Sequence, residues 1–512
     1  MKNKRSKWCF ATGCSGRDMC YNLVSMFFLM YVQYTNLLNK EQYAVLTTIV
    51  VICRVWDAIN DPIMGTIISN TKTRFGKYRP WVLIGALTNA VFLILMFSLR
   101  VEVKDNINQL GWYNVIILGV SYLLWGMTFT MNDVSYWSLL PVLADGKQDR
   151  DKLTTMVAVF ASIGAFVAGG LVPMLTPNNA IIAYRVISIV FALIFVASQI
   201  MVFFCVHDNK EDKFMIEKSE SEAGDKNVSL KDMVKILFRN KQLLVMAAVV
   251  LLYTLAGGLL VAFGQNFFYF KFEYGGSQVF IFTIMYAIGT IVSQAIFPAL
   301  ASKFKRMDIL RVCMIAVIVG YSLFFVVANL PIPANIAFIL ICCVGVFVFL
   351  GQGVFYMIML VMLANTIEYD EWKNNERNDA VTFSVRSFMV KLAGALQAFI
   401  VSAALLVSGL YDITQLVGEQ ESIIASNQGN QAIIEEAEAK ITELFTRASD
   451  GQMMVLSIFM TAVPVILLLS MTILIKKKYV ITEDLYDQMV AEIAARKEGA
   501  NAVEGESNVE AN

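Results

Sequence analysis

The stretch YAVLTTIVVICRVWDAINDPIMGTII, residues 43–68, combines two properties that seldom occur together. It is long enough to span a bilayer, because a transmembrane helix needs about 20 mostly apolar residues. It nevertheless carries Arg54, Asp57 and Asp61 within that length. A charge inside a membrane segment is costly, so the stretch predicts a membrane helix whose charged residues have a function.

The whole chain shares this apolar character. Of its 512 residues 57% are hydrophobic and 16% are charged, whereas soluble domains hold about 25% charged residues. Twelve segments are long and apolar enough to span a membrane: residues 8–34, 43–68, 81–99, 112–141, 153–175, 181–206, 243–269, 278–300, 309–330, 336–365, 380–409 and 453–475. We therefore expect an all-α membrane protein with twelve transmembrane helices. The basic residues 1–7 precede no small-residue cleavage site, so the first segment is expected to be a membrane helix and not a cleaved signal.

The loops between these segments differ in charge. Basic loops follow the second, fourth, eighth and twelfth segments, at residues 71–80, 145–152, 303–306 and 476–478. Charge-poor loops such as residues 176–180 and 331–335 alternate with them. By the positive-inside rule, both termini are expected in the cytoplasm of a multi-pass cell-membrane protein.

Residues 207–242 form the longest predicted cytoplasmic loop and fall between the sixth and seventh segments. They divide the chain into a six-helix bundle over residues 1–206 and a second over 243–475, followed by a cytoplasmic tail over 476–512. Two six-helix halves with a charged linker are typical of the major facilitator architecture.

Two polar regions lie outside this plan. The acidic loop 411–452 is expected outside the cell, where residues 429–448 form either an amphipathic surface helix or a solvated cap. The tail predicts a short helix near residues 483–496, and the polar residues after it are expected to lack structure.

Eight charged residues lie within the predicted helices. They are Arg17, Asp18, Arg54, Asp57, Asp61, Asp133, Arg386 and Lys391. Four are positive and four are negative, so they can neutralise one another around one cavity. Structural ion pairs are the alternative, but the concentration of these charges in the first half favours a functional site.

The second segment points to a cation site. Asp57 and Asp61 are four residues apart and therefore share one helix face. Two carboxylates in an apolar pocket repel each other until one takes up a proton or both hold a cation. Asn60 and Thr130 offer neutral oxygens that suit sodium, and Arg54 offsets part of the negative charge. Sodium is preferred here, and a proton remains the alternative.

The fourth segment points to a carbohydrate site. Asp133 and Trp137 are one turn apart, so a carboxylate and an indole ring face the same side. A carboxylate accepts hydrogen bonds from sugar hydroxyls, and an indole packs on the apolar face of a pyranose. Taken alone, this pair is a weak signal.

Several motifs together resemble one family. The runs RVWDAINDPIMG (54–65) and NTKTRFGKYRPW (70–81) resemble the signature of the glycoside–pentoside–hexuronide:cation symporters, melibiose permease-like members of the major facilitator superfamily. WGMTFTMNDVSYWS (125–138) resembles the family's fourth helix. The pair at residues 17–18 and the run at 389–391 resemble its first and eleventh helices.

The resemblance implies alternating-access symport of a sugar or glycoside with a cation. It implies a coupling-cation site formed by Asp57, Asn60, Asp61 and Thr130. It implies sugar contacts from Asp18, Asp133 and Trp137, with Arg17 beside them. Lys391 would lie close to both sites and help to link the halves.

Two positions depart from the melibiose-type pattern. Ala158 stands where that pattern has a sugar-contacting arginine, which argues against a galactoside. Arg386 stands where the pattern has a glutamine. We hypothesise that Arg386 supplies the lost positive charge from the other half, either toward an anionic sugar such as a hexuronide or as a partner of Asp18 or Asp133. The loop 411–452 is also absent from the pattern.

Other functions fit less well. The one histidine, His207, lies at a membrane edge, and no Ser or Cys has a base at useful spacing, so no enzyme is expected. The eight cysteines show no metal-like or disulfide-like spacing and are interpreted as packing residues. No cofactor other than the coupling ion and no nucleic-acid partner are expected, and a monomer in the bilayer should suffice. The alternatives are a symporter of another solute such as a lysolipid, and a sugar sensor without transport.

Overall fold

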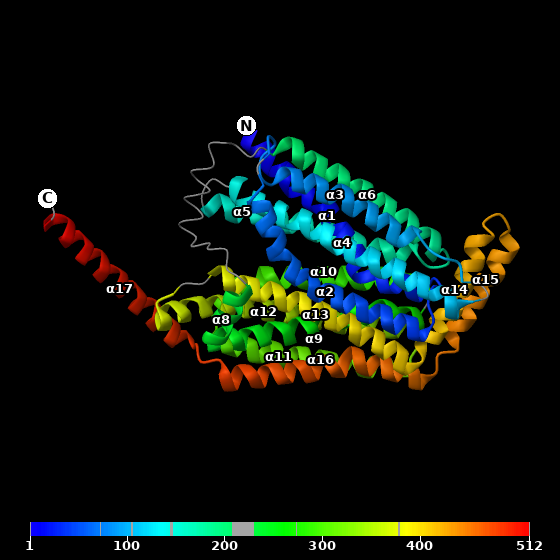
Figure 1. The fold of residues 1–512 in the computed structure, drawn as a ribbon. Helices are drawn as coiled ribbons and strands as arrows, with labels where there is room; N and C mark the ends of the chain where they lie inside the picture. The colour runs from blue at the N-terminus through cyan, green and yellow to red at the C-terminus, as the bar shows by residue number, and fades with distance from the viewer. Residues whose placement is uncertain are drawn as a thin grey trace.

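The computed structural model describes residues 2–71, 73–103, 106–143, 147–206, 230–272, 274–376 and 379–510, which form helices and no strand (Figure 1). The first half contains α1 (Lys2–Gln33), α2 (Lys40–Ser69), α3 (Arg79–Ser98), α4 (Ile107–Leu143), α5 (Lys147–Leu175) and α6 (Ala180–Cys205). Each of the first six predicted segments corresponds to one of these helices.

The second half contains α9 (Lys241–Lys271), α10 (Ser277–Ala301), α11 (Arg306–Asn329), α12 (Ala334–Asn374), α13 (Asp379–Ser408) and α16 (Asp450–Lys478). These six helices correspond to the other six predicted segments. Of the predicted linker 207–242, residues 207–229 lie outside the described residues, and α8 (Leu230–Arg239) leads directly into α9.

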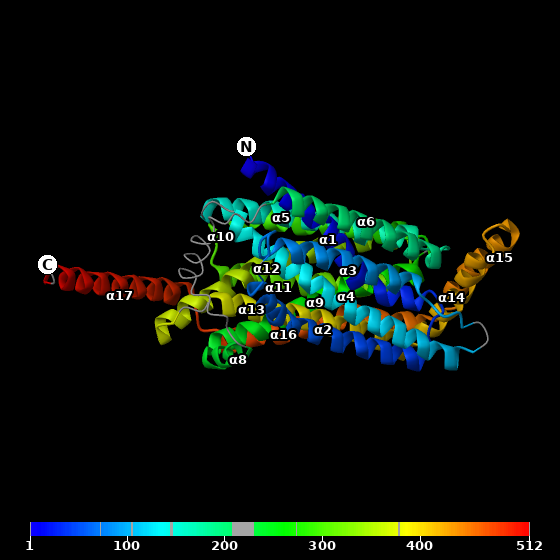
Figure 2. The same ribbon diagram turned by 45° about the horizontal axis from the view of Figure 1, so that its top comes forward.

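The long helices form two bundles that lie side by side (Figures 1 and 2). In the first bundle α1 packs on α5 and α6, and α4 packs on α2 and α3. In the second bundle α9 packs on α13 and α16, and α12 packs on α10 and α11. The bundles meet along two seams, where α2 contacts α13 and α5 contacts α10. The charged residues of α2 therefore lie at the boundary between the bundles.

The lengths and compositions of the helices fit a membrane. Within the described residues ten helices are long and apolar enough to span a bilayer, and α2 is an eleventh if its two parts, bent by 42°, form one span. The remaining predicted span, the first, corresponds to α1. It is long enough to cross a bilayer, but its mean hydropathy is too low for it to be counted with the others. Arg17, Asp18 and Asn22 lie inside its apolar stretch and lower its hydropathy.

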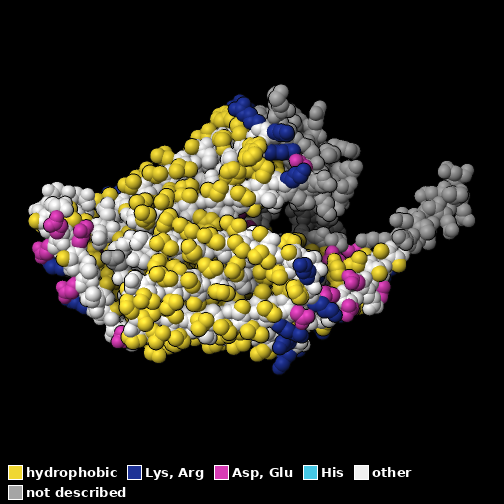
Figure 3. Space-filling view, turned by 180° about the vertical axis from the view of Figure 1, so that it is seen from behind, with side chains coloured by type: hydrophobic (Ala, Val, Ile, Leu, Met, Phe, Trp, Pro, Cys, Tyr) yellow, Lys and Arg dark blue, Asp and Glu magenta, His cyan; other side chains and the backbone are white. Residues whose placement is uncertain are grey.

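The distribution of side chains on the surface also fits a membrane protein. Hydrophobic side chains cover the middle of the face in Figure 3, and charged side chains gather at its two ends. An apolar surface of this extent is stable against lipid and not against water.

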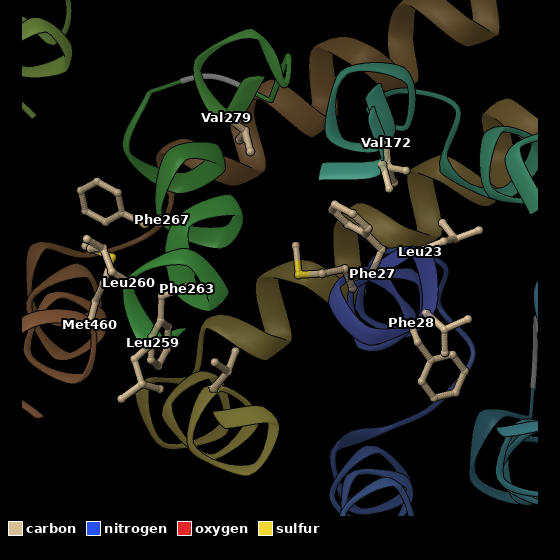
Figure 4. Packing of buried hydrophobic residues seen from close by; sticks show 14 of the residues in the cluster. Leu23, Phe27, Phe28, Val172, Leu259, Leu260, Phe263, Phe267, Val279 and Met460 are labelled. Carbon is tan, nitrogen blue, oxygen red and sulfur yellow. The ribbon is translucent and has the colours of Figure 1, made fainter. Parts of the chain in front are cut away.

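Apolar packing fills the interior of both bundles. The close-up in Figure 4 draws side chains from α1, α5, α9, α10 and α16: Leu23, Phe27, Phe28, Val172, Leu259, Leu260, Phe263, Phe267, Val279 and Met460. All ten belong to one buried cluster that continues from the first bundle into the second. Charged residues that lie among this apolar packing are therefore candidates for a site.

The two ends of the molecule differ. The terminal end carries the start of α1, α8 and α17 (Glu483–Glu510), and the opposite end, called the α14 end, carries α14 (Leu410–Ser426) and α15 (Gln431–Thr446) (Figure 1). α15 corresponds to the amphipathic helix predicted at residues 429–448, and α14 was not predicted. The expectation that the residues after Arg496 lack structure is wrong, because α17 continues to Glu510. No proline interrupts this segment, and its Ala and Glu residues favour a helix, whereas Gly499 and Gly505 are poor helix formers.

Candidate functional site

Two turns of α2 face two turns of α4. Thr130 of α4 donates a hydrogen bond from Oγ1 to Asp61 Oδ1 at 3.2 Å. One turn earlier on each helix, Gly126 faces Asp57, so closely that a Cβ on Gly126 would lie 2.6 Å from Asp57 Oδ1. The predicted shared face of Asp57 and Asp61 is confirmed, and it points at α4.

Lys391 of α13 brings the second bundle to this site. Its Nζ forms an ion pair with Asp61 Oδ2. The Asp61 side chain is 33% exposed and the Lys391 side chain 29% exposed, although both lie on long helices between the bundles. Asp57 lies within electrostatic reach of Lys391, Asp61 and Arg54. The structure therefore places Lys391 against Asp61, one of the carboxylates assigned to the predicted cation site.

Arg54 and Asn60 lie near the two carboxylates but form no hydrogen bond with them. Arg54 donates from Nε to the Tyr122 hydroxyl at 3.1 Å and from Nη2 to the Ser25 carbonyl at 3.0 Å. Its hydrogen bonds thus go to α4 and α1, and it acts on Asp57 only through its charge. Asn60 is buried, and its Nδ2 has no hydrogen-bond partner among the described residues.

The bend in α2 falls at these residues. The two straight parts of the helix are Lys40–Asp57 and Ile59–Ile68. Pro62 lies inside the helix and has no N–H, so the carbonyl four residues earlier, at Ala58, has no helical donor. A backbone oxygen without its usual donor therefore lies between Asp57 and Asp61.

A second cluster surrounds Arg17, which is 2% exposed. Its guanidinium contacts Asp18 Oδ2 of the same helix at 3.1 Å and Asp133 Oδ1 of α4 at 3.1 Å. Cys14 donates from Sγ to Asp18 at 2.9 Å and accepts from Arg17 at 3.1 Å. One arginine therefore holds the two carboxylates that the sequence assigned to the sugar.

Aromatic rings complete this cluster. The Arg17 guanidinium lies 4.6 Å from the ring centre of Tyr136 and 5.2 Å from that of Trp137. Tyr136 is fully buried, whereas Trp137 is 39% exposed. The indole is therefore partly open one turn from Asp133, and an open indole face can pack on a pyranose ring.

The two clusters lie next to each other along α4. Thr130 and Asp133 lie on neighbouring turns of α4, and Asp133 is within electrostatic reach of both Asp61 and Lys391. A charge that enters or leaves at Asp61 therefore changes the potential at Asp133.

Arg386 of α13 has a different environment from the other charges. It donates from Nη2 to the Tyr356 hydroxyl of α12 at 2.5 Å, and its buried Nε has no hydrogen-bond partner among the described residues. Within the described residues it forms no ion pair, so the alternative that Arg386 pairs with Asp18 or Asp133 does not describe this conformation. Ala158 of α5 is exposed and offers no charge.

The contact residues that were not predicted include Cys14, Tyr136 and Tyr356. Cys14 and Tyr136 bracket Arg17, and their helix spacing to Arg17 and Asp133 would have placed them on the correct faces. Tyr356 has no such signal, because it lies inside an apolar run of α12. Its stacking on Tyr253, with ring centres 6.2 Å apart, appears only in three dimensions.

The site is closed at the α14 end. Among the described residues, hydrogen bonds between the bundles gather there, apart from the Lys391–Asp61 contact. They include Tyr34 to Asn266 at 2.9 Å, Tyr43 with Ser402 at 3.0 Å, and Tyr269 to the Pro173 carbonyl at 3.0 Å. Asp61, Lys391 and Trp137 nevertheless keep part of their side-chain surface exposed.

Comparison with known proteins identifies the class. The model of the MFS/sugar transport protein family matches residues 9–483, and the chain belongs to this family. The major facilitator fold is thereby confirmed, as is the expectation of a transporter and not an enzyme.

The relatives support this assignment. The lactose permease of Lactobacillus delbrueckii subsp. bulgaricus is 26% identical over 96% of this chain and 73% of its own length. The lactose permease of Leuconostoc lactis is 28% identical over 78% of this chain, which spans only 62% of that relative. The glucuronide carrier protein homolog of Escherichia coli is 25% identical over 78% of this chain and 84% of its own length.

Solved structures share the fold. A bacterial homolog of the human lysosomal transporter Spinster, in an inward-facing conformation, superposes with a TM-score of 0.57 at 11% identity, covering 94% of this chain and 99% of that one. A mutant of the nucleoside transporter NupG gives the same TM-score at 12% identity, covering 92% of this chain and 99% of that one.

Proposed function

We propose that this protein is a symporter that couples a cation, sodium ahead of a proton, to the transport of a sugar or glycoside. The observation that carries the proposal is the pair of linked clusters around α4. Asp57, Asp61 and Thr130 offer oxygens to a cation, and Asp18, Asp133 and Trp137 offer acceptors and a ring face to a sugar. Relatives named as permeases of lactose and a carrier of raffinose support a sugar substrate.

The ion pair between Lys391 and Asp61 suggests how the cation acts. In this conformation the ammonium group of Lys391 neutralises Asp61. A sodium ion bound by Asp57, Asp61, Asn60 and Thr130 would compete with Lys391 for Asp61. Hard cations prefer oxygen ligands, and a proton would need none of the neutral ones.

Transport would proceed by alternating access. The two bundles rock around the site between them, and the conformation described here is closed at the α14 end. The basic residues at the terminal end, among them Lys305 and Lys476, favour a cytoplasmic position for that end and for both termini. We propose that a monomer in the cell membrane is the functional unit.

A hexuronide or another anionic sugar is a second candidate for the substrate class. Arg386 offers a buried Nε–H that meets no partner in the described part of the chain, beside the Tyr356 hydroxyl, which suits a carboxylate. The glucuronide carrier homolog among the relatives has a name that fits this chemistry.

The test is uptake into proteoliposomes that contain the purified protein, with a panel of glycosides, pentosides and hexuronides. Uptake is measured with an inward sodium gradient and with choline in place of sodium, at one fixed pH. We expect accumulation above the external concentration only with sodium. Equal accumulation in choline would reject sodium, and a pH gradient then tests the proton.

The variant Asp61→Asn separates coupling from binding. We expect it to lose uphill accumulation while exchange of internal for external sugar survives, because the neutral amide no longer needs a cation. The matched control is Asp308→Asn, which changes an exposed carboxylate on α11 that pairs with Arg311. Uphill accumulation by Asp61→Asn at the control's rate would reject the assigned cation site.

A further inference from the structure

α14 follows a helix of the second bundle but packs against the first. The Tyr411 hydroxyl donates to the Leu38 carbonyl at 3.0 Å, and Gln415 donates to the same carbonyl at 2.5 Å. Asp412 forms an ion pair with Lys40 at 2.5 Å. α14 therefore lies across the boundary of the two bundles at the end where the molecule is closed.

Glu421 lies at the centre of this boundary and is 0% exposed. Its Oε2 accepts a hydrogen bond at 2.8 Å from the backbone N–H of Ala180, the first residue of α6. Its Oε1 accepts one at 2.9 Å from the Tyr274 hydroxyl, in the connection between α9 and α10. One carboxylate thus joins α14 to both bundles.

Tyr274 extends this contact to the other closing residues. Its ring centre lies 5.7 Å from Tyr34, just after α1, 4.9 Å from Tyr269 of α9 and 4.9 Å from Phe445 of α15. Separation of the bundles at this end must pull Ala180 away from Tyr274. Glu421 then loses at least one partner and meets water.

We propose that Glu421 is the latch of this closure: its carboxyl group joins α14 to both bundles while the α14 end is shut, and it exchanges a proton with solvent when that end opens. The inference rests on the proposed alternating access and on the orientation that places the α14 end outside the cell. It assigns a proton-binding residue that is separate from the coupling-cation site.

The electrostatics of the latch agree with this role. Burial raises the pKa of Glu421 to about 7, although hydrogen bonds from the Ala180 backbone, Tyr274 and the Asn178 backbone lower it. The ionisable groups that face it from neighbouring elements are Glu438 on α15, which raises the pKa further, and the phenols of Tyr184 on α6, Tyr269 on α9 and Tyr274. In an open conformation the carboxyl group is in water, where the pKa of a glutamate is about 4.3.

The direction of the pH effect follows. The closed conformation has the raised pKa and therefore binds the proton more tightly than the open one. This proton therefore stabilises the closed conformation relative to the open one. The stabilisation is complete below the pKa of Glu421 in the open conformation and is lost as the pH rises through about 7. Between pH 6 and pH 8 the ratio of closed to open molecules should fall about tenfold.

The experiment measures a distance and needs neither sodium nor sugar. Spin labels are placed at Gln109, at the start of α4, and at Thr442 on α15, in the full chain with its native cysteines replaced by alanine. Both positions are exposed. Pulsed electron paramagnetic resonance in liposomes then gives the closed and open populations at pH 6 and pH 8.

We expect the closed population of the wild-type background to fall from pH 6 to pH 8. Glu421→Gln keeps the shape without the charge and should remain closed at both values, while Tyr274→Phe should weaken closure at both. Glu419→Gln, an exposed neighbour on α14, is the matched control and should titrate like wild type. A pH response in Glu421→Gln equal to that of wild type would overturn the proposal. Because the readout is independent of transport, this failure would leave the proposed symport untouched.

Discussion

Arg386 brings a positive charge to a part of the second bundle that otherwise offers aromatic rings. Tyr253 stacks on Phe355 with ring centres 4.9 Å apart and on Tyr356 at 6.2 Å, and Tyr356 in turn accepts a hydrogen bond from Arg386. Stacked rings present flat apolar surface, and the guanidinium presents directed donors. Together they suit a sugar ring that carries an acidic group.

We predict that Arg386→Gln weakens the apparent affinity for an anionic sugar by about tenfold to a hundredfold, since a hydrogen bond to a charged group contributes about 1.5–3 kcal/mol. A neutral glycoside should lose much less. Concentration-dependent uptake of both substrate types measures the difference. Arg311→Gln, on the exposed surface of α11, is the matched control. Unchanged affinity for every substrate would remove Arg386 from the site.

At the scale of single residues, helix periodicity predicted a large part of the site. The four-residue spacing of Asp57 and Asp61 was enough to place them on one face. The contact between Lys391 and Asp61 joins residues 330 positions apart, so it followed only from the resemblance to a family. Tyr356 was missed because an apolar run gives no sign of which ring meets an arginine.

At the scale of elements, the connection between α9 and α10 meets the end of α5. Gly276 has a φ of +71°, and a Cβ on it would lie 1.8 Å from the Pro173 carbonyl oxygen. Only glycine adopts this backbone region readily, and only glycine lets the second bundle approach the first so closely here. The closure of the α14 end therefore depends on the absence of a side chain at residue 276.

We predict that Gly276→Ala shifts the molecule toward conformations that are open at the α14 end. The added methyl group collides with Pro173 only while that end is closed. The distance between labels at Gln109 and Thr442 should therefore lengthen in most molecules at pH 6. Gly275→Ala is the control, since a Cβ there meets no atom within 4 Å. An unchanged closed population in Gly276→Ala would contradict the prediction.

The packing of α14 could not be predicted from the sequence. An acidic segment between two membrane helices indicates a solvated region, and α15 with its exposed glutamates fits that expectation. α14 instead buries Tyr411, Val417 and Glu421 against the first bundle. A glutamate in an acidic loop cannot be recognised as buried from composition, because its burial is set by residues such as Ala180 and Tyr274, more than a hundred positions away.

At the scale of the whole molecule, the proposed site predicts reciprocal binding. If sodium raises the affinity for the sugar by some factor, the sugar must raise the affinity for sodium by the same factor. Calorimetric titration of each ligand, with and without the other, measures both factors in the purified protein. Asp61→Asn should abolish the coupling, whereas Asp308→Asn should preserve it. Sugar affinity that does not respond to sodium in the wild-type protein would argue against the shared site.

The overall architecture was easier to predict from the sequence than the contacts of single residues or the packing of α14. All twelve segments appear as helices, because the thickness of the bilayer fixes the length of an apolar run that crosses it. The closure at one end was not predictable, because it depends on which conformation of the two bundles is occupied, and hydropathy carries no information about that.

The hairpin of α14 and α15 has a practical consequence. Small transporters are difficult to align in single-particle electron microscopy because most of their mass lies inside the detergent micelle. Here α15 projects beyond the bundles (Figure 1). It exposes the acidic residues Glu435, Glu436 and Glu443. An antibody fragment raised against this helix would provide a rigid marker outside the micelle.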